Sequence, residues 1–142
     1  MITDAINKEF DKARRRSWDR IYVFVDLHET ILYPDYQFEK PEVKYYPFAK
    51  ELLIHLSQRQ DVCLVLWTCS HPHQIEYYKE IMKDDGILFD HVNCNPEVST
   101  SEKYGYYNDK PYYNIMLDDK SGIVPEELPV ILETFKKQDL LK

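Results

Sequence analysis

Glycine is scarce in this chain, whose 142 residues include only Gly86, Gly105 and Gly122. A nucleotide-binding phosphate loop needs several closely spaced glycines, because its backbone must approach the phosphates and adopt left-handed conformations. These three glycines are far apart in the sequence. The sequence therefore excludes an ATP-dependent kinase of the phosphate-loop class.

Cysteine is also sparse, with Cys63, Cys69 and Cys94 and no C-x-x-C pair. This number and spacing predict neither a disulfide framework nor a zinc cluster, so we expect a reducing, cytoplasmic environment. A cysteine phosphatase would need an arginine shortly after Cys69, and CSHPHQIE has none, which favours a structural thiol. His71 and His73 lack a third ligand nearby and are interpreted as a helix entry rather than a zinc site.

Long apolar runs are absent as well. No segment reaches the ~18 apolar residues of a membrane span, and the charged N-terminal segment does not resemble a signal peptide. A net charge of −7 disfavours extended contact with nucleic acid, because phosphates would be repelled. We therefore expect no membrane association, and the charge leaves room for a small anionic substrate held by a metal.

Short apolar, β-branched runs predict the strands. They lie at Ile21–Val25, Val62–Trp67 and Tyr113–Leu117, with weaker candidates at Ile87–Phe89 and Val92–Cys94. Such strands, alternating with helices, indicate a parallel sheet covered on both sides, in the α/β class.

Four amphipathic patterns predict the helices. The first pattern contains Ile6, Phe10 and Ala13, and the last contains Leu128, Ile131, Leu132 and Phe135. The second contains Phe48, Leu52 and Leu56, with Pro47 at the first helical position. The third contains Ile75, Tyr78 and Met82, and we expect this helix to stop at 84–86. We expect a single domain over 1–142, with an N-terminal helix at 1–17, a core at 21–122 and a C-terminal helical segment at 125–142.

Reactive side chains follow three of the predicted strands. The first strand ends at Asp26, the second at Thr68 and the last at Asp118 and Asp119. Ligands of open parallel sheets bind beyond the carboxyl ends of the strands, so these side chains are expected to converge. Magnesium prefers oxygen ligands and usually takes one or two carboxylates. The pattern favours phosphoryl transfer through a carboxylate nucleophile with Mg²⁺ as cofactor.

The chain resembles the haloacid dehalogenase-like (HAD) superfamily of phosphatases in four ordered motifs. VFVDLHET, with Asp26 and Thr30, is similar to the first motif, a strand followed by DxDxT. LVLWTCS, with Thr68, is similar to the second, and DKPYYNIMLDDKSG resembles the third and fourth together. The motifs span residues 21–122. The resemblance implies an HAD-like (Rossmann-like) three-layer domain with a mainly parallel central sheet.

The resemblance also implies roles for the motif residues. Asp26 would attack phosphorus and ligate Mg²⁺, with the backbone carbonyl of His28 and the carboxylate of Asp118 as further ligands. Asp119 would hold water in the outer coordination sphere, and Thr68 would bind a phosphate oxygen.

Lysine and hydroxyl side chains would complete the substrate site. Lys110 is the expected phosphate lysine, with Lys103 and Lys120 as weaker candidates and a solvated surface charge as the alternative. Thr30 and Ser70 are expected near substrate, although Ser70 is favoured as a helix cap over a phosphate contact.

Two residues depart from the superfamily pattern. His28 stands where the hydrolases usually carry an aspartate as general acid and base, and Glu29 stands where glycine is common. A histidine can transfer protons near neutrality, so His28 is either a substitute acid and base or a substitution in a slow or retired site. Loss of general acid–base help costs about 10²–10⁴ in rate. Glu29 leaves open a different path for the turn.

Two stretches, Tyr33–Tyr46 and Asn95–Tyr112, are predicted to be irregular. The superfamily carries its caps in these windows, and both stretches are too short for a cap domain. A capless site would be covered by a large substrate or by a second subunit of a homo-oligomer. The tyrosines of the second stretch either stack on a base or sugar or pack against the domain, and packing is favoured.

The leading hypothesis is a magnesium-dependent phosphatase acting on a nucleotide or another small phosphate ester, with nucleic acid a less favoured substrate. The alternatives are a catalytically weak or silent HAD-like module that binds metal, phosphate or a partner protein, and a phosphotransferase.

Overall fold

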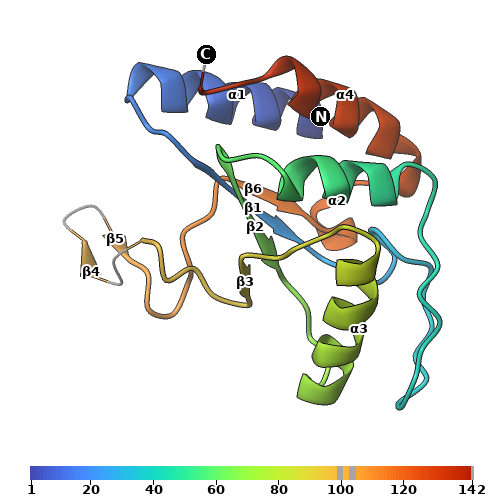
Figure 1. Ribbon diagram of the computed structural model, residues 1–142. Coiled ribbons are helices and arrows are strands. Elements are labelled where there is room, and N and C mark those ends of the chain that lie inside the picture. Colours follow the sequence, from blue (N-terminus) through green and yellow to red (C-terminus); the bar gives the residue numbers. More distant parts are fainter. Residues whose placement is uncertain (99–100, 103–104, 142) are drawn as a thin grey trace.

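A parallel four-stranded sheet is the centre of the computed structural model, which describes residues 1–98, 101–102 and 105–141 (Figure 1). Its strands are β1 (Ile21–Val25), β2 (Val62–Leu66), β3 (His91–Val92) and β6 (Ile115–Leu117), in the order β3-β2-β1-β6. β4 (Ser101–Glu102) and β5 (Gly105–Tyr106) form a separate antiparallel pair. The predicted α/β class and parallel sheet are confirmed.

Four α-helices contribute to one apolar core on one face of the sheet. They are α1 (Ile2–Arg15), α2 (Ala49–Ser57), α3 (Pro72–Asp84) and α4 (Leu128–Lys137), and two short 3-10 helices, η1 (Asp119–Ser121) and η2 (Pro125–Glu127), precede α4. Their buried side chains form a single cluster with alternate residues of β1 and β2, including Val23 and Leu64. The predicted stripes of α1 and α4 lie fully in this cluster, as the helical spacing of their apolar residues requires.

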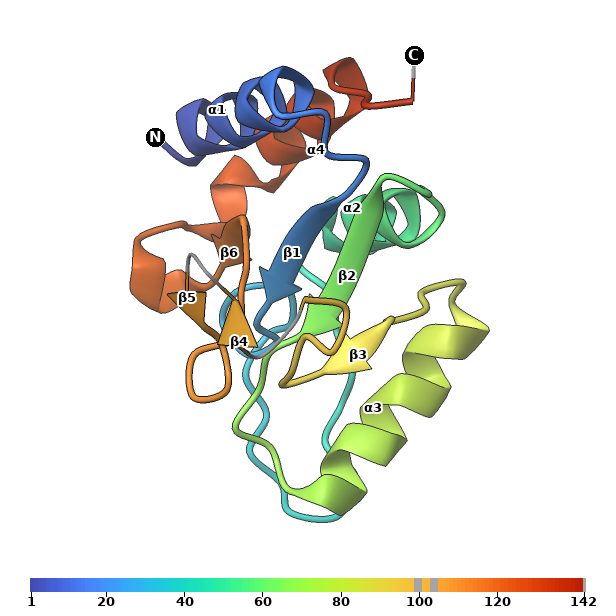
Figure 2. The same ribbon diagram turned by 90° about the vertical axis from the view of Figure 1, so that its left-hand side faces the viewer.

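The other face of the sheet carries no α-helix in the described part of the chain. Phe24, Cys63 and Val65 form a separate small cluster there. The connection from β3 to β6 supplies aromatic cover: the Tyr113 ring packs against Phe24, and the Tyr112 ring lies edge-on to the Tyr22 ring. Figure 2 views the sheet from this side, with β4 and β5 in front of it. Packing, the favoured role for these tyrosines, is confirmed for Tyr112 and Tyr113.

In the described part of the chain, the predicted cover on both faces comes from α-helices on one face only, and the handedness of the connections explains this difference. The steps from β1 to β2 and from β2 to β3 run in one direction across the sheet, so right-handed crossovers put α2 and α3 on the same side. The return from β3 to β6 runs the opposite way and must cross the other face. This return, residues 93–114, contains no α-helix among its described residues.

Several predicted boundaries are corrected by the structure. α2 begins at Ala49 rather than at Pro47, because Phe48 adopts a left-handed φ of 69° and its side chain is exposed. Ile87–Phe89 forms no strand, and the strand near Val92–Cys94 is β3 at His91–Val92. β6 is shorter than Tyr113–Leu117. None of the helices in the described residues combines the length and apolar character needed to cross a membrane.

A buried ion pair joins the end of α2 to the end of α4. The Arg59 guanidinium donates through Nε and Nη2 to the two carboxylate oxygens of Asp61, at 2.8 and 2.6 Å, and also donates to the backbone carbonyls of Phe135 and Gln138. Only 12% of the Arg59 side chain and 3% of the Asp61 side chain are exposed. Removing one partner would leave the other charge buried and uncompensated.

We expect Arg59→Ala to lower the free energy of unfolding by about 3–5 kcal/mol, because Asp61 would lose its counter-charge. Urea unfolding followed by circular dichroism measures this change. Arg14→Ala is the matched control, since Arg14 pairs with Asp11 at an exposed position, and we expect a change within about 0.5 kcal/mol. Equal losses in the two variants would contradict this account of the junction.

Candidate active site

Three carboxylates meet at the carboxyl ends of β1 and β6. Val25 and Leu117 are register partners, and the Asp26 backbone N–H donates to the Leu117 carbonyl at 2.9 Å, so the pairing continues past the strands. One carboxylate oxygen from each of Asp26, Asp118 and Asp119 lies within 4.8 Å of the other two. The three carboxylates expected to converge at this edge therefore do lie together.

The electrostatics of this cluster favour a bound cation. Burial, and then the negative charge of Asp118, raise the pKa of Asp26 from 3.8 to about 7. A divalent cation would offset the cost of burying the Asp26 charge and its repulsion from Asp118. The donor set consists of carboxylate oxygens, as a hard cation requires. The residues present therefore fit Mg²⁺.

Thr30 holds two of these carboxylates in place. Its hydroxyl lies 3.1 Å from Asp26 Oδ2 and 3.3 Å from Asp119 Oδ1, and it accepts a 2.8 Å hydrogen bond from the Asp119 backbone N–H. Only 2% of Thr30 is exposed. The structure shows a positioning role for Thr30, whereas its expected contact with substrate stays a prediction.

Glu29 takes a conformation that favours glycine. Its φ of 65° lies in the left-handed region, which is uncommon for a residue with a side chain. The turn is closed by hydrogen bonds to the Leu27 carbonyl from the N–H groups of Thr30, Ile31 and Leu32. Glu29 therefore holds, at some cost in strain, a backbone conformation that glycine would adopt freely.

A cavity of about 430 Å³ opens beside the carboxylates. Its lining includes Asp26, Asp119, Thr68 and Ser70. The Thr68 and Ser70 hydroxyls are 2.9 Å apart, and the Ser70 N–H donates to Thr68 Oγ1. The N-cap of α3 is His71, so the favoured role of Ser70 as the helix cap is wrong.

His28 also lines this cavity, with its ring held between two tyrosines. Its Nε2 is 3.2 Å from the Tyr78 hydroxyl on α3, and its ring centroid is 5.3 Å from that of Tyr36. Nδ1 is buried and has no hydrogen-bond partner in the described structure. Burial lowers the pKa of His28 below 6.5, against opposing contributions from Asp35 and Glu29, so the neutral imidazole dominates at pH 7.

The candidate phosphate lysines lie in different places. Lys120 lines the cavity, next to Asp119. The lining does not include Lys110, whose Nζ is 5.9 Å from the centroid of the Tyr113 ring. Lys103 lies outside the described residues. The geometry therefore favours Lys120 as the phosphate lysine, whereas the sequence pattern favours Lys110.

Three residues that the sequence pattern does not indicate also shape this site. The Asn93 side chain pairs with the backbone of Thr68 through two 2.8 Å hydrogen bonds, and so fixes the end of β2. Tyr78 contacts His28 from α3. Asp35 accepts hydrogen bonds from the N–H groups of Gln37 and Glu42 and lines the cavity. The sequence carries only weak signals for these residues. Asn93 directly follows a strand, and Tyr78 also fits the apolar stripe of a helix.

A second cavity, of about 530 Å³, lies near the start of β1. Its lining includes Arg16, Trp18, Tyr22 and Tyr112. Among the described residues, its lining contains no carboxylate cluster and no nucleophile at the end of a strand. The smaller cavity is therefore the better candidate active site.

Comparison with known proteins gives a fold and no family. No protein-family model matches the chain, and no curated protein does. A solved structure described as that of a conserved protein from Bacteroides thetaiotaomicron is similar, with 24% sequence identity and a TM-score of 0.63. The match covers 83% of this chain and 91% of that one. At this identity the likeness supports the α/β fold alone.

We expect Asp26→Asn to stabilise the metal-free protein at neutral and higher pH. The folded protein holds a proton on Asp26 up to about pH 7, whereas the unfolded chain releases it near 3.8. The wild type therefore loses stability as pH rises between these values, and the variant does not share this loss. The advantage of Asp26→Asn should grow from pH 5 to 7 and then level off at about 1–2 kcal/mol after allowance for solvent screening.

Urea unfolding in EDTA at several pH values measures this difference. Asp109→Asn, at an exposed position, is the control and should show no such growth. A difference between Asp26→Asn and wild type that does not change with pH would contradict the assigned electrostatics.

Proposed function

We propose that this protein is an HAD-like, magnesium-dependent phosphatase that works through an aspartyl-phosphate on Asp26. The observation that carries the proposal is the meeting of Asp26, Asp118 and Asp119 at the strand ends, beside a cavity lined with hydroxyl groups. A nucleophile, a cation site and phosphate-binding groups are the parts that phosphoryl transfer requires.

The carboxylates of Asp26 and Asp118 would hold Mg²⁺, with Asp119 in its outer sphere and the backbone carbonyl of His28 as a further ligand. The cation, when bound, supplies positive charge that screens the nucleophile and the phosphate oxygens from one another.

Asp26 is the proposed nucleophile of the covalent step. An oxygen of its carboxylate forms a bond to phosphorus while the bond from phosphorus to the leaving oxygen breaks, and that oxygen takes up a proton. Water then attacks the phosphorus of the aspartyl-phosphate and releases phosphate, which restores the Asp26 carboxylate. The Thr30 hydroxyl holds the carboxylates of Asp26 and Asp119 in position through both steps. Thr68, Ser70 and Lys120 supply hydrogen bonds and charge to the phosphate oxygens.

His28 is the proposed proton carrier. Its Nε2 contacts the Tyr78 hydroxyl and its Nδ1 is buried, so the ring, which lines the cavity, would have to turn to bring a nitrogen to the leaving oxygen or to water. The lowered pKa makes the neutral form abundant, which suits the removal of a proton from water better than the donation to the leaving group. Protonation of the leaving group should therefore become the slower step as pH rises.

The proposed substrate is a small phosphate ester or a nucleotide. Tyr36 and Phe38, from the segment between β1 and α2, are exposed aromatic side chains in the cavity lining. They offer a surface on which a base or sugar can stack. Glu29 and Asp35 make the surroundings acidic, which disfavours a long polyanion.

We expect Mg²⁺-dependent release of phosphate from a panel of phosphate esters and nucleotides. Asp26→Asn should abolish release, and His28→Ala should lower kcat by about 10²–10⁴. Asp109→Asn should match the wild type. Turnover that survives in Asp26→Asn would contradict the nucleophile, and equal rates for wild type and His28→Ala would contradict the proton carrier.

A catalytically silent, ligand-binding module is the second candidate, favoured by the histidine at position 28. Thermal unfolding with Mg²⁺ and beryllium fluoride, a mimic of a phosphoryl group on aspartate, separates the two. A rise in Tm that requires Asp26, together with turnover, supports the phosphatase. The same rise without turnover on any substrate of the panel supports the silent module.

A further inference from the structure

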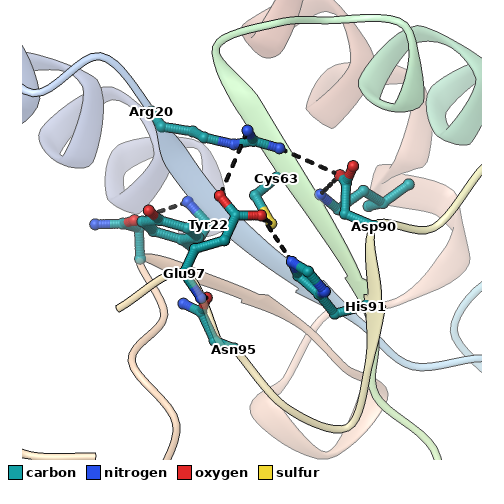
Figure 3. Close-up of polar contacts among 9 residues, drawn as sticks. Arg20, Tyr22, Cys63, Asp90, His91, Asn95 and Glu97 are labelled. Carbon is teal, nitrogen blue, oxygen red and sulfur yellow. Dashed lines mark hydrogen bonds and ion pairs between the residues drawn. The ribbon is translucent and has the colours of Figure 1, made fainter. Parts of the chain in front are cut away.

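A second group of metal-ligating side chains lies on the sheet face where no α-helix occurs among the described residues. Cys63 is on β2, His91 begins β3, and Glu97 follows in the connection to β6. One ligand atom from each lies within 4.8 Å of the other two. Cys63 Sγ is 3.2 Å and His91 Nε2 is 2.7 Å from the same oxygen, Glu97 Oε2 (Figure 3).

The strand register explains why these residues meet although they are far apart in the sequence. His91 is the partner of Val65, which lies on the same sheet face as Cys63. Neighbours in register point to the same side, so His91 and Cys63 share this face. Tyr22 is the partner of Cys63 and lies four residues before Asp26. Four residues of a strand span about 13 Å, and this distance separates the Cys63 cluster from the carboxylate cluster.

The donor set matches a zinc-type ion. Thiolate sulfur, imidazole nitrogen and carboxylate oxygen are the three ligand types that Zn²⁺ takes, and three protein ligands leave a fourth position for water. Cys63 is 0% exposed, whereas the side chains of His91 and Glu97 are 23% and 27% exposed. An ion can therefore enter past the partly exposed His91 and Glu97 and reach the buried sulfur of Cys63.

The groups around the cluster supply charge balance and orientation. Arg20 lies between Glu97 Oε1, 3.4 Å from Nη1, and Asp90 Oδ2, 3.6 Å from Nη2. Asp90 Oδ2 also accepts the Leu64 N–H at 2.8 Å. These contacts hold the outer oxygen of Glu97 and leave Oε2 directed at Cys63 and His91 (Figure 3). The positive charges of a divalent ion and Arg20 would balance the negative charges of the Cys63 thiolate, Glu97 and Asp90, so the group would be neutral.

We propose that Cys63, His91 and Glu97 bind a zinc-type divalent ion that fastens the connection from β3 to β6 onto the sheet face that lacks a helix. Asn95 already joins the two ends of this connection, since its Nδ2 donates to the Tyr112 carbonyl and its Oδ1 accepts the Glu97 N–H. An ion at Glu97 would anchor this connection to β2 and β3.

Binding exchanges one proton for the ion. Burial, and then the hydrogen bond to Glu97, raise the pKa of the Cys63 thiol to about 12, so the S–H bond is intact without metal. On binding, this bond breaks, the sulfur lone pair goes to the ion, and the proton passes to solvent. No oxidant or reductant is needed.

Cobalt titration of the full-length, EDTA-treated protein tests the proposal. We expect a thiolate-to-cobalt charge-transfer band that saturates at one ion per chain and is displaced by Zn²⁺. Cys63→Ser should remove the band, and Glu97→Gln and His91→Gln should each weaken zinc affinity by at least about tenfold in competition with a chelator. Both of the latter positions are partly exposed, so these variants keep the test valid if Cys63→Ser does not fold.

Three variants distinguish this site from other metal-binding groups. Cys69→Ser removes the thiol beside His71 and His73, Cys94→Ser removes the other exposed thiol, and Asp118→Asn disrupts the carboxylate cluster. All three should retain the charge-transfer band. Absence of the band in the wild type, its loss in Cys69→Ser or Cys94→Ser, or its persistence in Cys63→Ser would overturn the proposal. None of these readouts depends on phosphatase activity.

Discussion

Like charges held together at one edge of a parallel sheet are the constraint on which the rest of the site depends. Asp26 and Asp118 follow paired strands, so the sheet register itself brings their carboxylates together. Burial, and then the repulsion from Asp118, raise the pKa of Asp26 to about 7. The Thr30 hydroxyl and the left-handed backbone of Glu29 keep this arrangement in place. A folded protein can retain such an arrangement because strain and repulsion at a functional site are balanced by packing elsewhere.

The packing that balances this repulsion lies mainly on one side of the sheet. All four α-helices contribute to a single core there, and the Arg59–Asp61 pair joins α2 to the end of α4. The other face relies on aromatic rings and on the polar group around Glu97. The two candidate metal sites therefore have different settings: one lies at the strand ends beside a cavity, and the other lies on the face where the cover is irregular.

The sequence predicted the elements that local pattern controls. β1, the extent of α3 and the buried stripes of α1 and α4 follow from apolar spacing and from Pro72 and Gly86. The meeting of Asp26 with Asp118 was also predictable, because both residues end buried strands of a parallel sheet. These inferences needed only periodicity and the general rule for strand ends.

Long-range geometry was not predictable from the pattern. Nothing near Lys110 or Lys120 in the sequence shows which ammonium group faces the cavity. The cluster of Cys63, His91 and Glu97 depends on register between two strands and on the path of a loop, so a search for closely spaced ligands could not detect it. The contact between His28 and Tyr78 likewise depends on where α3 packs.

A crystal structure with Mg²⁺ and beryllium fluoride tests the central claim most directly. The account predicts one octahedral ion that contacts carboxylate oxygens of both Asp26 and Asp118, with the fluoride complex attached to Asp26 inside the cavity. Side chains of Asp26 and Asp118 that point apart, or an ion and fluoride complex bound away from Asp26 at saturating concentrations, would contradict it.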